Sequence, residues 1–323
     1  MTDINTLQKL VEESMQEMHV DHQPENLYKP VAYSLAAGGK RLRPVLVLMA
    51  YELYRSDINK ALKPAIGIEV FHNFTLLHDD IMDKSAIRRG KPTVQAKWNP
   101  NIALLSGDAM SFIATDLINE APHNQNNVTK AFTRAALDVC EGQQYDMEFE
   151  SQKNIAESDY LKMIKLKTAS LIAVSLKIGG LMANAPHDDV TWLYKLGISM
   201  GLGFQLQDDW LDCYGDQVKF GKPIGKDIIN RKKTYLWILA NQRAGKKEKA
   251  ELNALMGNDE ISKDEKIKSV RYFYDKLNVS MLALEKINMF FDEASTLISR
   301  MNVAPDKKIE LKKMLSQLNK RDF

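Results

Sequence analysis

Helical spacing of apolar residues runs through almost the entire chain. Near the N-terminus, Leu10 and Val11 lie three and four residues after Leu7, a spacing that places the three side chains on one face of an α-helix. Longer apolar stretches at 45–54 and 190–211 continue this pattern. No segment alternates apolar and polar residues for long enough to build a sheet. Helices without strands must bury their apolar faces against one another, so the sequence predicts an all-α fold.

The chain is predicted to form one helical domain spanning residues 1–323. Its length alone suggests about two domains of ~150 residues each, but no stretch of linker composition divides it. Pro24 and Pro30 are expected to lie in a short connection between helices. The charged stretch 245–268 is expected to contain exposed connections, and one helix is expected over 269–299.

Composition excludes several classes of protein. The chain is 45% hydrophobic and 27% charged with a net charge of +2, as in ordinary globular proteins, so nucleic acid is not an expected partner. No apolar run approaches the ~18 residues of a membrane span, and the N-terminus lacks the apolar core of a signal peptide. Cys140 and Cys213 have no metal-site spacing. We therefore expect a cytoplasmic protein without a membrane span.

Two short acidic clusters stand about 130 positions apart, each near the C-terminal end of an apolar helix. A carboxylate there faces the negative end of the helix dipole, at a cost of about 0.3–1 kcal/mol. A solvated helix face would explain either cluster alone, but the repeated DDxxD pattern in the same setting favours a bound cation. The carboxylates are Asp79, Asp80 and Asp83 in the first cluster and Asp208, Asp209 and Asp212 in the second.

The ligand chemistry indicates Mg²⁺ beside phosphates. Clusters of carboxylate oxygens suit a hard cation, and Mg²⁺ usually keeps positions open for substrate phosphates. Each basic segment alone is typical of an exposed turn, but the segments together indicate binding sites for two phosphorylated ligands. They contain Lys40, Arg41 and Arg43, then Arg88 and Arg89, then Lys167, and finally Lys222, Lys226, Lys232 and Lys233.

Two histidines lie on the helix that carries the first cluster. His72 is seven residues before Asp79, which places it on the same face two turns earlier. We expect a polar contact between His72 and a bound anion. His78 is expected to be a hydrogen-bonded core residue, because that is the commoner role of a single histidine on an apolar helix.

The ordered set of these motifs resembles the trans-isoprenyl diphosphate synthases of the polyprenyl synthetase family, which includes farnesyl and geranylgeranyl diphosphate synthases. The motifs are GGKRLRP, HDDIMD followed by RRG, LKT, FQLQDDWLD and GKPIGKD, within about Tyr33–Thr234. The resemblance implies a helical bundle around a deep central cavity, usually as a homodimer. It also implies Mg²⁺-dependent, head-to-tail condensation of an allylic diphosphate with isopentenyl diphosphate.

The resemblance also assigns roles to individual residues. It implies about three Mg²⁺ ions on the allylic diphosphate, with Asp79, Asp83 and Asp208 as first ligands and the other three aspartates as second choices. The clamp on the allylic diphosphate would consist of Arg88, Lys167, Lys222 and Lys232. The catalytic residues would be Lys167, Thr168 and Gln205, of which Thr168 and Gln205 would stabilise the allylic cation. The isopentenyl diphosphate site would consist of Lys40, Arg43, His72 and Arg89.

Product length is expected to depend on residues just before the first aspartate cluster. In the family, a bulky side chain at the position of Phe74 stops elongation at C15 to C20, so a geranylgeranyl or farnesyl diphosphate is the expected product. At about 100° per residue, however, Thr75 lies nearer than Phe74 to the face of Asp79. A longer-chain synthase remains an alternative, and a terpene cyclase is a more distant one.

Overall fold

The computed structural model describes residues 1–323 except 19, 21, 153, 216–223, 259 and 321–323. The N-terminal half contains α1 (Ile4–Gln16), α2 (Glu25–Leu35), α3 (Leu42–Glu52), η1 (Ile58–Ala61), α4 (Leu62–Met82), β1 (Ile87–Arg88), β2 (Lys91–Pro92), α5 (Val94–Lys97), α6 (Pro100–Asn119) and α7 (Gln125–Ser151). The C-terminal half contains α8 (Glu157–Ile164), η2 (Lys165–Ala169), α9 (Ser170–Met182), α10 (His187–Tyr214), α12 (Lys226–Ile229), α13 (Tyr235–Arg243), α14 (Lys246–Gly257), α15 (Lys263–Lys276), α16 (Val279–Arg300), η3 (Pro305–Lys308) and α17 (Ile309–Lys320). The prediction of an all-α fold is confirmed.

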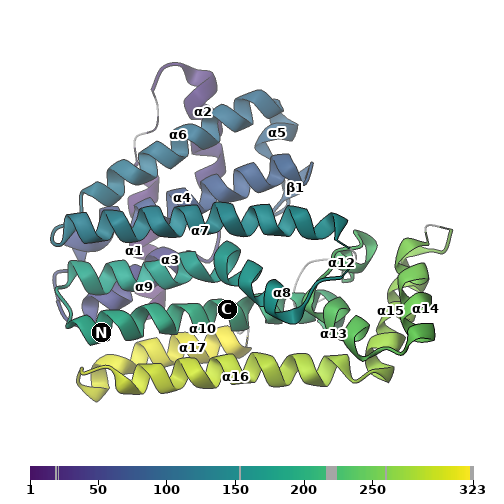
Figure 1. The fold of residues 1–323 in the computed structure, drawn as a ribbon. Coiled ribbons are helices and arrows are strands. Elements are labelled where there is room, and N and C mark those ends of the chain that lie inside the picture. The colour runs from purple at the N-terminus through teal and green to yellow at the C-terminus, as the bar shows by residue number, and fades with distance from the viewer. Residues whose placement is uncertain (19, 21, 153, 216–223, 259, 321–323) are drawn as a thin grey trace.

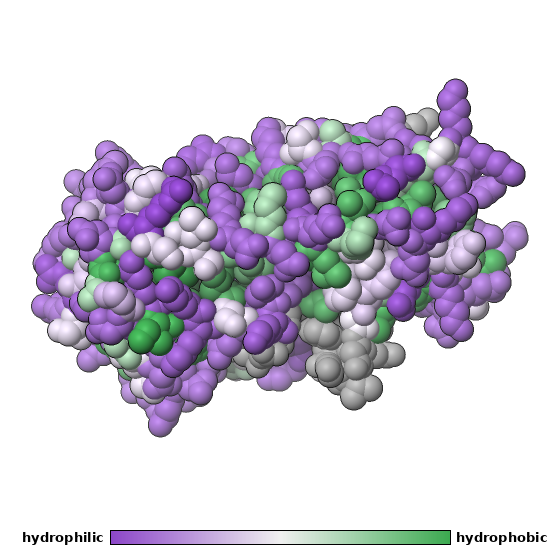
Figure 2. All heavy atoms as spheres, turned by 90° about the horizontal axis from the view of Figure 1, so that it is seen from below, coloured by the Kyte–Doolittle hydropathy of each residue, from purple (hydrophilic) through white to green (hydrophobic). Residues whose placement is uncertain are grey.

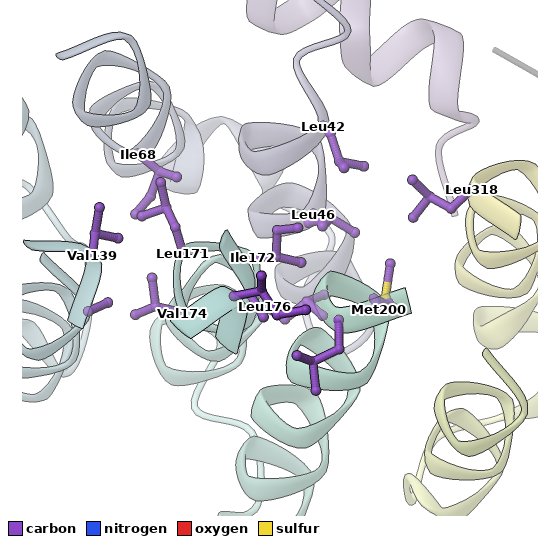
Figure 3. Close-up of a cluster of buried hydrophobic side chains, with 14 of the residues drawn as sticks. Leu42, Leu46, Ile68, Val139, Leu171, Ile172, Val174, Leu176, Met200 and Leu318 are labelled. Atoms are coloured by element: carbon purple, nitrogen blue, oxygen red, sulfur yellow. The ribbon is translucent and has the colours of Figure 1, made fainter. Parts of the chain in front are cut away.

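Helix α9 lies at the centre of the core. It packs against α3, α7 and α10, while α16 covers the other side of α10 (Figure 1). Its composition explains this position, because nearly every residue from Ser170 to Met182 is buried. Leu171, Ile172 and Leu176 meet apolar side chains from α3, α4, α7 and α10 (Figure 3). This central packing fixes the helices that carry the candidate site.

Two expectations about local structure were wrong, and a third was right only in part. Pro30 lies inside α2, where it is buried with Val31 and Leu35, rather than in a connection. The stretch 245–268 has exposed residues such as Glu260 and Ser262 between its helices, as expected, but most of it forms α14 and the beginning of α15. It is rich in strong helix formers such as Lys, Glu, Ala and Leu. The helix expected over 269–299 is divided, because Asn278 adopts a left-handed conformation between α15 and α16.

The ends of α4, α7 and α10 gather on one side of the molecule, near α12 and α13 (Figure 1). A small antiparallel hairpin, β1–β2, follows α4 there. Arg89 and Gly90 form its two-residue turn with φ values of 51° and 74°, as a hairpin of this length requires. Both acidic clusters are thereby carried to the same side.

Helix α6 has an unusually apolar exposed face. By length and composition alone this helix could cross a membrane. One third of its most apolar 18-residue stretch is buried inside the molecule. Leu105 and Phe112 are 60% and 75% exposed. The face formed by α16 and α17 is different, because its apolar side chains are scattered among hydrophilic ones (Figure 2). Helices α6 and α16 each carry three large exposed apolar side chains, and α6 has the most exposed of them, Phe112.

Candidate functional site

The first aspartate cluster occupies the last turn of α4. Asp80 is buried and accepts hydrogen bonds from Nε of Arg88 at 2.8 and 2.9 Å. Asp79 lies 3.9 Å from Nζ of Lys167, and burial together with the nearby charge of Asp83 raises its pKa. Asp83 ends the helix and is exposed. Asp80 is thus tied to the protein, while Asp79 and Asp83 keep oxygens available for a ligand.

The second cluster lies on α10, and one of its carboxylates, Asp209, has a mainly structural role. Asp209 is buried and accepts hydrogen bonds from Tyr160 Oη at 2.5 Å, the backbone N–H of Tyr235 at 3.1 Å and Gln205 Nε2 at 3.2 Å. Burial and the charge of Asp227 raise the pKa of Asp209 to about 7. Asp209 therefore joins α8, α10 and α13.

The other two carboxylates of α10 face outward from this structural centre. Asp208 is exposed. Asp212 accepts a hydrogen bond from the backbone N–H of Asp227 at 2.9 Å. Burial and the charge of Asp227 raise the pKa of Asp212 to about 6. Carboxylates that raise one another's pKa have too little positive charge around them.

Asp146 of α7 connects the two clusters through lysines. It accepts a hydrogen bond from Lys167 Nζ at 2.7 Å and lies 3.8 Å from Lys232 Nζ. Burial favours the neutral form of this carboxyl, but the two lysines lower its pKa. Desolvation would lower the pKa of Lys232, yet attraction to Asp146, Asp227, Asp209 and Asp83 raises it. Lys167 lies 3.9 Å from Asp79 of the first cluster, and Lys232 is attracted to Asp209 of the second, so both clusters lie near the lysines that contact Asp146.

The donors near these lysines fit Mg²⁺. They are carboxylate oxygens without cysteine or histidine, which suits a hard cation. Within the part of the chain that the structure describes, no three acidic side chains already form a metal cage. The lysines Lys167 and Lys232 lie among the carboxylates instead. Cation binding would relieve the carboxylate repulsion seen at Asp79 and Asp212.

A π-helical turn, η2, interrupts the regular helix beside Asp146 and contains both Lys167 and Thr168. Such turns change the backbone hydrogen-bonding pattern and are common at functional sites. Thr168 Oγ1 donates to Gln205 Oε1 at 3.0 Å. The structure therefore brings together the side chains that were predicted to stabilise a cation.

Gly142 allows η2 to approach α7 closely. A Cβ atom at this position would lie 2.2 Å from the backbone nitrogen of Lys167. The missing side chain lets Lys167 reach Asp146, which lies one turn further along α7. Gly142 thus belongs to the structural basis of the site.

A second, positively charged group lies between α3, α4 and the hairpin. Arg43 Nη1 lies 3.1 Å from His72 Nε2, and Arg43 Nε is buried without a hydrogen-bond partner. Burial lowers the pKa of Arg43 to about 10. Burial and the charges of Arg43 and Arg89 lower the pKa of His72 well below 6.5. An anion at this position would offset both effects.

The Gly38–Gly39 turn brings Arg89 to the same region. Arg89 Nη1 donates to the carbonyl of Gly38, and a Cβ atom on Gly39 would lie 3.0 Å from that guanidinium group. Gly39 has a φ of 146°. Lys40 follows this turn and is exposed. Arg41, in contrast, is buried in ion pairs with Glu12 and Glu69, so its role is structural.

Phe74 and Thr75, the predicted determinants of product length, lie one turn before the first cluster. The Phe74 ring lies 5.3 Å from that of Phe71 and 4.6 Å from that of His78. Thr75 Oγ1 donates to the carbonyl of His72 within the same helix at 2.8 Å. Phe74 therefore belongs to a row of aromatic rings, whereas the Thr75 hydroxyl is satisfied locally.

Sequence reasoning missed Asp146 and Asp227. Asp146 is one of five acidic residues in α7, and no motif distinguishes it from the others. Asp227 was read as part of a basic loop. Lys222 was predicted to bind diphosphate, but it lies outside the described residues.

Comparisons with known proteins agree with this arrangement. A family model described as polyprenyl synthetase matches residues 24–274. The short chain isoprenyl diphosphate synthase of Methanocaldococcus jannaschii is 41% identical, with the match covering 82% of this chain and 80% of that protein. The geranylgeranyl diphosphate synthase of Saccharolobus solfataricus is 39% identical, over 78% and 80% of the two chains. A crystal structure of a geranylgeranyl pyrophosphate synthase superposes with a TM-score of 0.94 at 38% identity, covering 99% of each chain.

Proposed function

Because this chain belongs to the polyprenyl synthetase family, we propose that it joins an allylic diphosphate head-to-tail to isopentenyl diphosphate. The enzyme is a prenyltransferase, and its relatives include short-chain synthases. The proposed product is an all-trans prenyl diphosphate of C15 to C20, either geranylgeranyl or farnesyl diphosphate.

The convergence of the two aspartate clusters around Lys167 and Lys232 carries this proposal. Asp146 pairs with both lysines, and Lys232 is attracted to carboxylates of each cluster. Asp79, Asp83 and Asp208 would hold about three Mg²⁺ ions. Bound Mg²⁺ would withdraw electrons from the leaving diphosphate and favour cleavage of its bond to the allylic carbon.

The protein's own side chains would bind and orient the two substrates. Arg88, Lys167 and Lys232 would turn toward the oxygens of the allylic diphosphate, as guanidinium and ammonium groups do. The Thr168–Gln205 pair would present its oxygen dipoles to the allylic cation. Apolar walls would exclude water, which would otherwise quench that cation.

The second positive group would bind isopentenyl diphosphate. Arg43 has an unpaired buried Nε atom, and its Nη1 atom lies 3.1 Å from Nε2 of His72. Arg89 and Lys40 lie on the two adjoining turns. The alkene would attack the allylic cation, and the proton lost afterwards would pass to the released diphosphate. No side-chain base is required.

We also propose that the enzyme is a cytoplasmic homodimer. The exposed apolar face of α6 supports the dimer, because two copies would bury Leu105 and Phe112. The absence of metal or disulfide spacing at the cysteines supports the cytoplasmic location.

The experiment that tests the proposed reaction measures diphosphate release with Mg²⁺, isopentenyl diphosphate and either dimethylallyl, geranyl or farnesyl diphosphate. We expect release that depends on both isopentenyl diphosphate and Mg²⁺, with radiolabelled products of C15 to C20. Release without isopentenyl diphosphate would indicate a cyclase or phosphatase instead. Products mainly longer than C20 would indicate a longer-chain synthase, and no release with any primer would refute the proposed reaction.

A further inference from the structure

His78 lies between Phe74 and helix α6 and has no role in the proposed reaction. Its ring lies edge-on to that of Phe74, with centroids 4.6 Å apart and planes at 66°. Its Nε2 lies 3.1 Å from the carbonyl oxygen of Leu104. A nitrogen at this distance from a carbonyl acts as the donor, so the imidazole is fixed to α6 while one of its sides supports Phe74.

The position of His78 depends on Gly107. A Cβ atom at residue 107 would lie 2.3 Å from Nε2 of His78 and 2.5 Å from its Cδ2. No L-side chain fits there unless the imidazole moves. Gly107 therefore provides the space in which His78 reaches the backbone of α6.

The rest of the surroundings leave Phe74 dependent on this support. Its other ring partner is Phe71, one turn earlier, which in turn packs against Phe132 of α7 at 5.1 Å. Phe71 is buried, whereas Phe74 is only partly buried. One side of the Phe74 ring is therefore fixed by core packing and the other by His78.

We propose that His78 is a positioning residue that holds the Phe74 ring and thereby limits product length. This inference rests on the proposed synthase function and on Phe74 as the residue that stops elongation. A held ring blocks the growing chain, whereas a ring that can swing aside admits one more isoprene unit. Supporting an aromatic ring in this geometry favours one orientation by about fivefold, so its loss should change the ratio of longer to normal product by a similar factor.

The test compares product lengths of His78→Ala, His78→Phe and Gly107→Ala with those of wild type and Phe74→Ala. Each protein is given farnesyl diphosphate, radiolabelled isopentenyl diphosphate and Mg²⁺. Phe74→Ala should lengthen the product. His78→Ala should raise the share of longer product about fivefold, and Gly107→Ala should do the same although its imidazole is intact. His78→Phe should restore most of the wild-type distribution, because a ring again supports Phe74.

A double variant separates positioning from general loosening of the fold. If His78 acts through Phe74, Phe74→Ala/His78→Ala should give the same products as Phe74→Ala alone. His187→Ala, at a side chain 95% exposed, should match wild type. Lower thermal stability of His78→Ala with unchanged product lengths would overturn the inference and leave the synthase function standing. Unchanged products from Phe74→Ala would overturn the inference and the role of Phe74, whereas an inactive wild type would refute the function itself.

Discussion

At the scale of single residues, Arg43 and His72 form a positively charged group that an anion would stabilise. Both lie near Arg89, and among the residues that the structure describes no carboxylate forms an ion pair with either of them. The carboxylate that attracts Arg43 is Glu69, which is already paired with Arg41. Burying like charges together is unfavourable, so a role in binding a diphosphate accounts for an arrangement that stability alone would not favour.

Replacement of His72 by Gln should reduce the loss of stability on acidification. The pKa of His72 is depressed in the folded state, so only the unfolded chain takes up this proton as pH falls below about 6.5. The neutral His72 side chain therefore does not reduce the free energy of unfolding above about pH 6.5, but it reduces that free energy increasingly as the pH falls below this value. Between pH 7 and 5.5, the unfolding free energy of His72→Gln should fall by about 1 kcal/mol less than that of wild type.

Urea unfolding at several pH values measures this difference. His187→Gln is the matched control, because its exposed side chain should leave the pH dependence unchanged. Parallel curves for wild type and His72→Gln would contradict the buried, neutral histidine.

Single residues also show which parts of the site the sequence could predict. Motif order identified Thr168 and Gln205, which donate and accept one hydrogen bond although they are 37 positions apart. Asp146 escaped notice because its partners, Lys167 and Lys232, come from two other segments. No motif sets Asp146 apart from the other acidic residues of α7, so only the tertiary packing reveals its role.

At the scale of elements, the contact between α7 and η2 determines whether Lys167 can reach its partners. Gly142→Ala would place a Cβ atom 2.2 Å from the backbone of Lys167. The two elements must separate, at a cost of about 1–3 kcal/mol, and the pairing of Lys167 with Asp146 should weaken. We expect lower thermal stability and a lower kcat for diphosphate release.

Gly257→Ala provides the control for this change. It lies at the end of α14, and a Cβ atom there would meet nothing within 4 Å. Its stability and activity should match those of wild type. Equal behaviour of the two variants would show that η2 does not depend on close approach to α7.

The helices themselves were largely predictable, and the exceptions have physical causes. Apolar periodicity predicted the long helices α4 and α10 to within a few residues. It could not predict the π-helical turn, because η2 shares its apolar spacing with the neighbouring helices. It also missed α14, where helix-forming residues rather than an apolar stripe determine the structure.

At the scale of the whole molecule, the apolar face of α6 should determine the oligomeric state. Phe112→Asp would place a charge at a side chain that is 75% exposed in the single chain. The variant should remain folded but elute as a monomer, whereas wild type should have twice the 36.7 kDa chain mass. Light scattering after size-exclusion chromatography measures both masses.

Tyr272→Asp serves as the control for the loss of an exposed aromatic ring. Tyr272 is 66% exposed on α15, away from α6. This variant should keep the mass of the wild type. A wild-type protein that is already monomeric would contradict the proposed dimer.

The lysines that join the two aspartate clusters have a consequence for turnover. In the free enzyme, Lys167 and Lys232 already neutralise Asp146. On the proposed function, the substrate must first separate these partly exposed pairs. Part of the favourable interaction between the lysines and the incoming diphosphate would therefore offset the loss of their contacts with Asp146, which weakens the net binding of the ligand. When the reaction is complete, the pairs would re-form as the product leaves, so the lysines proposed to bind the substrate would also speed release of the product.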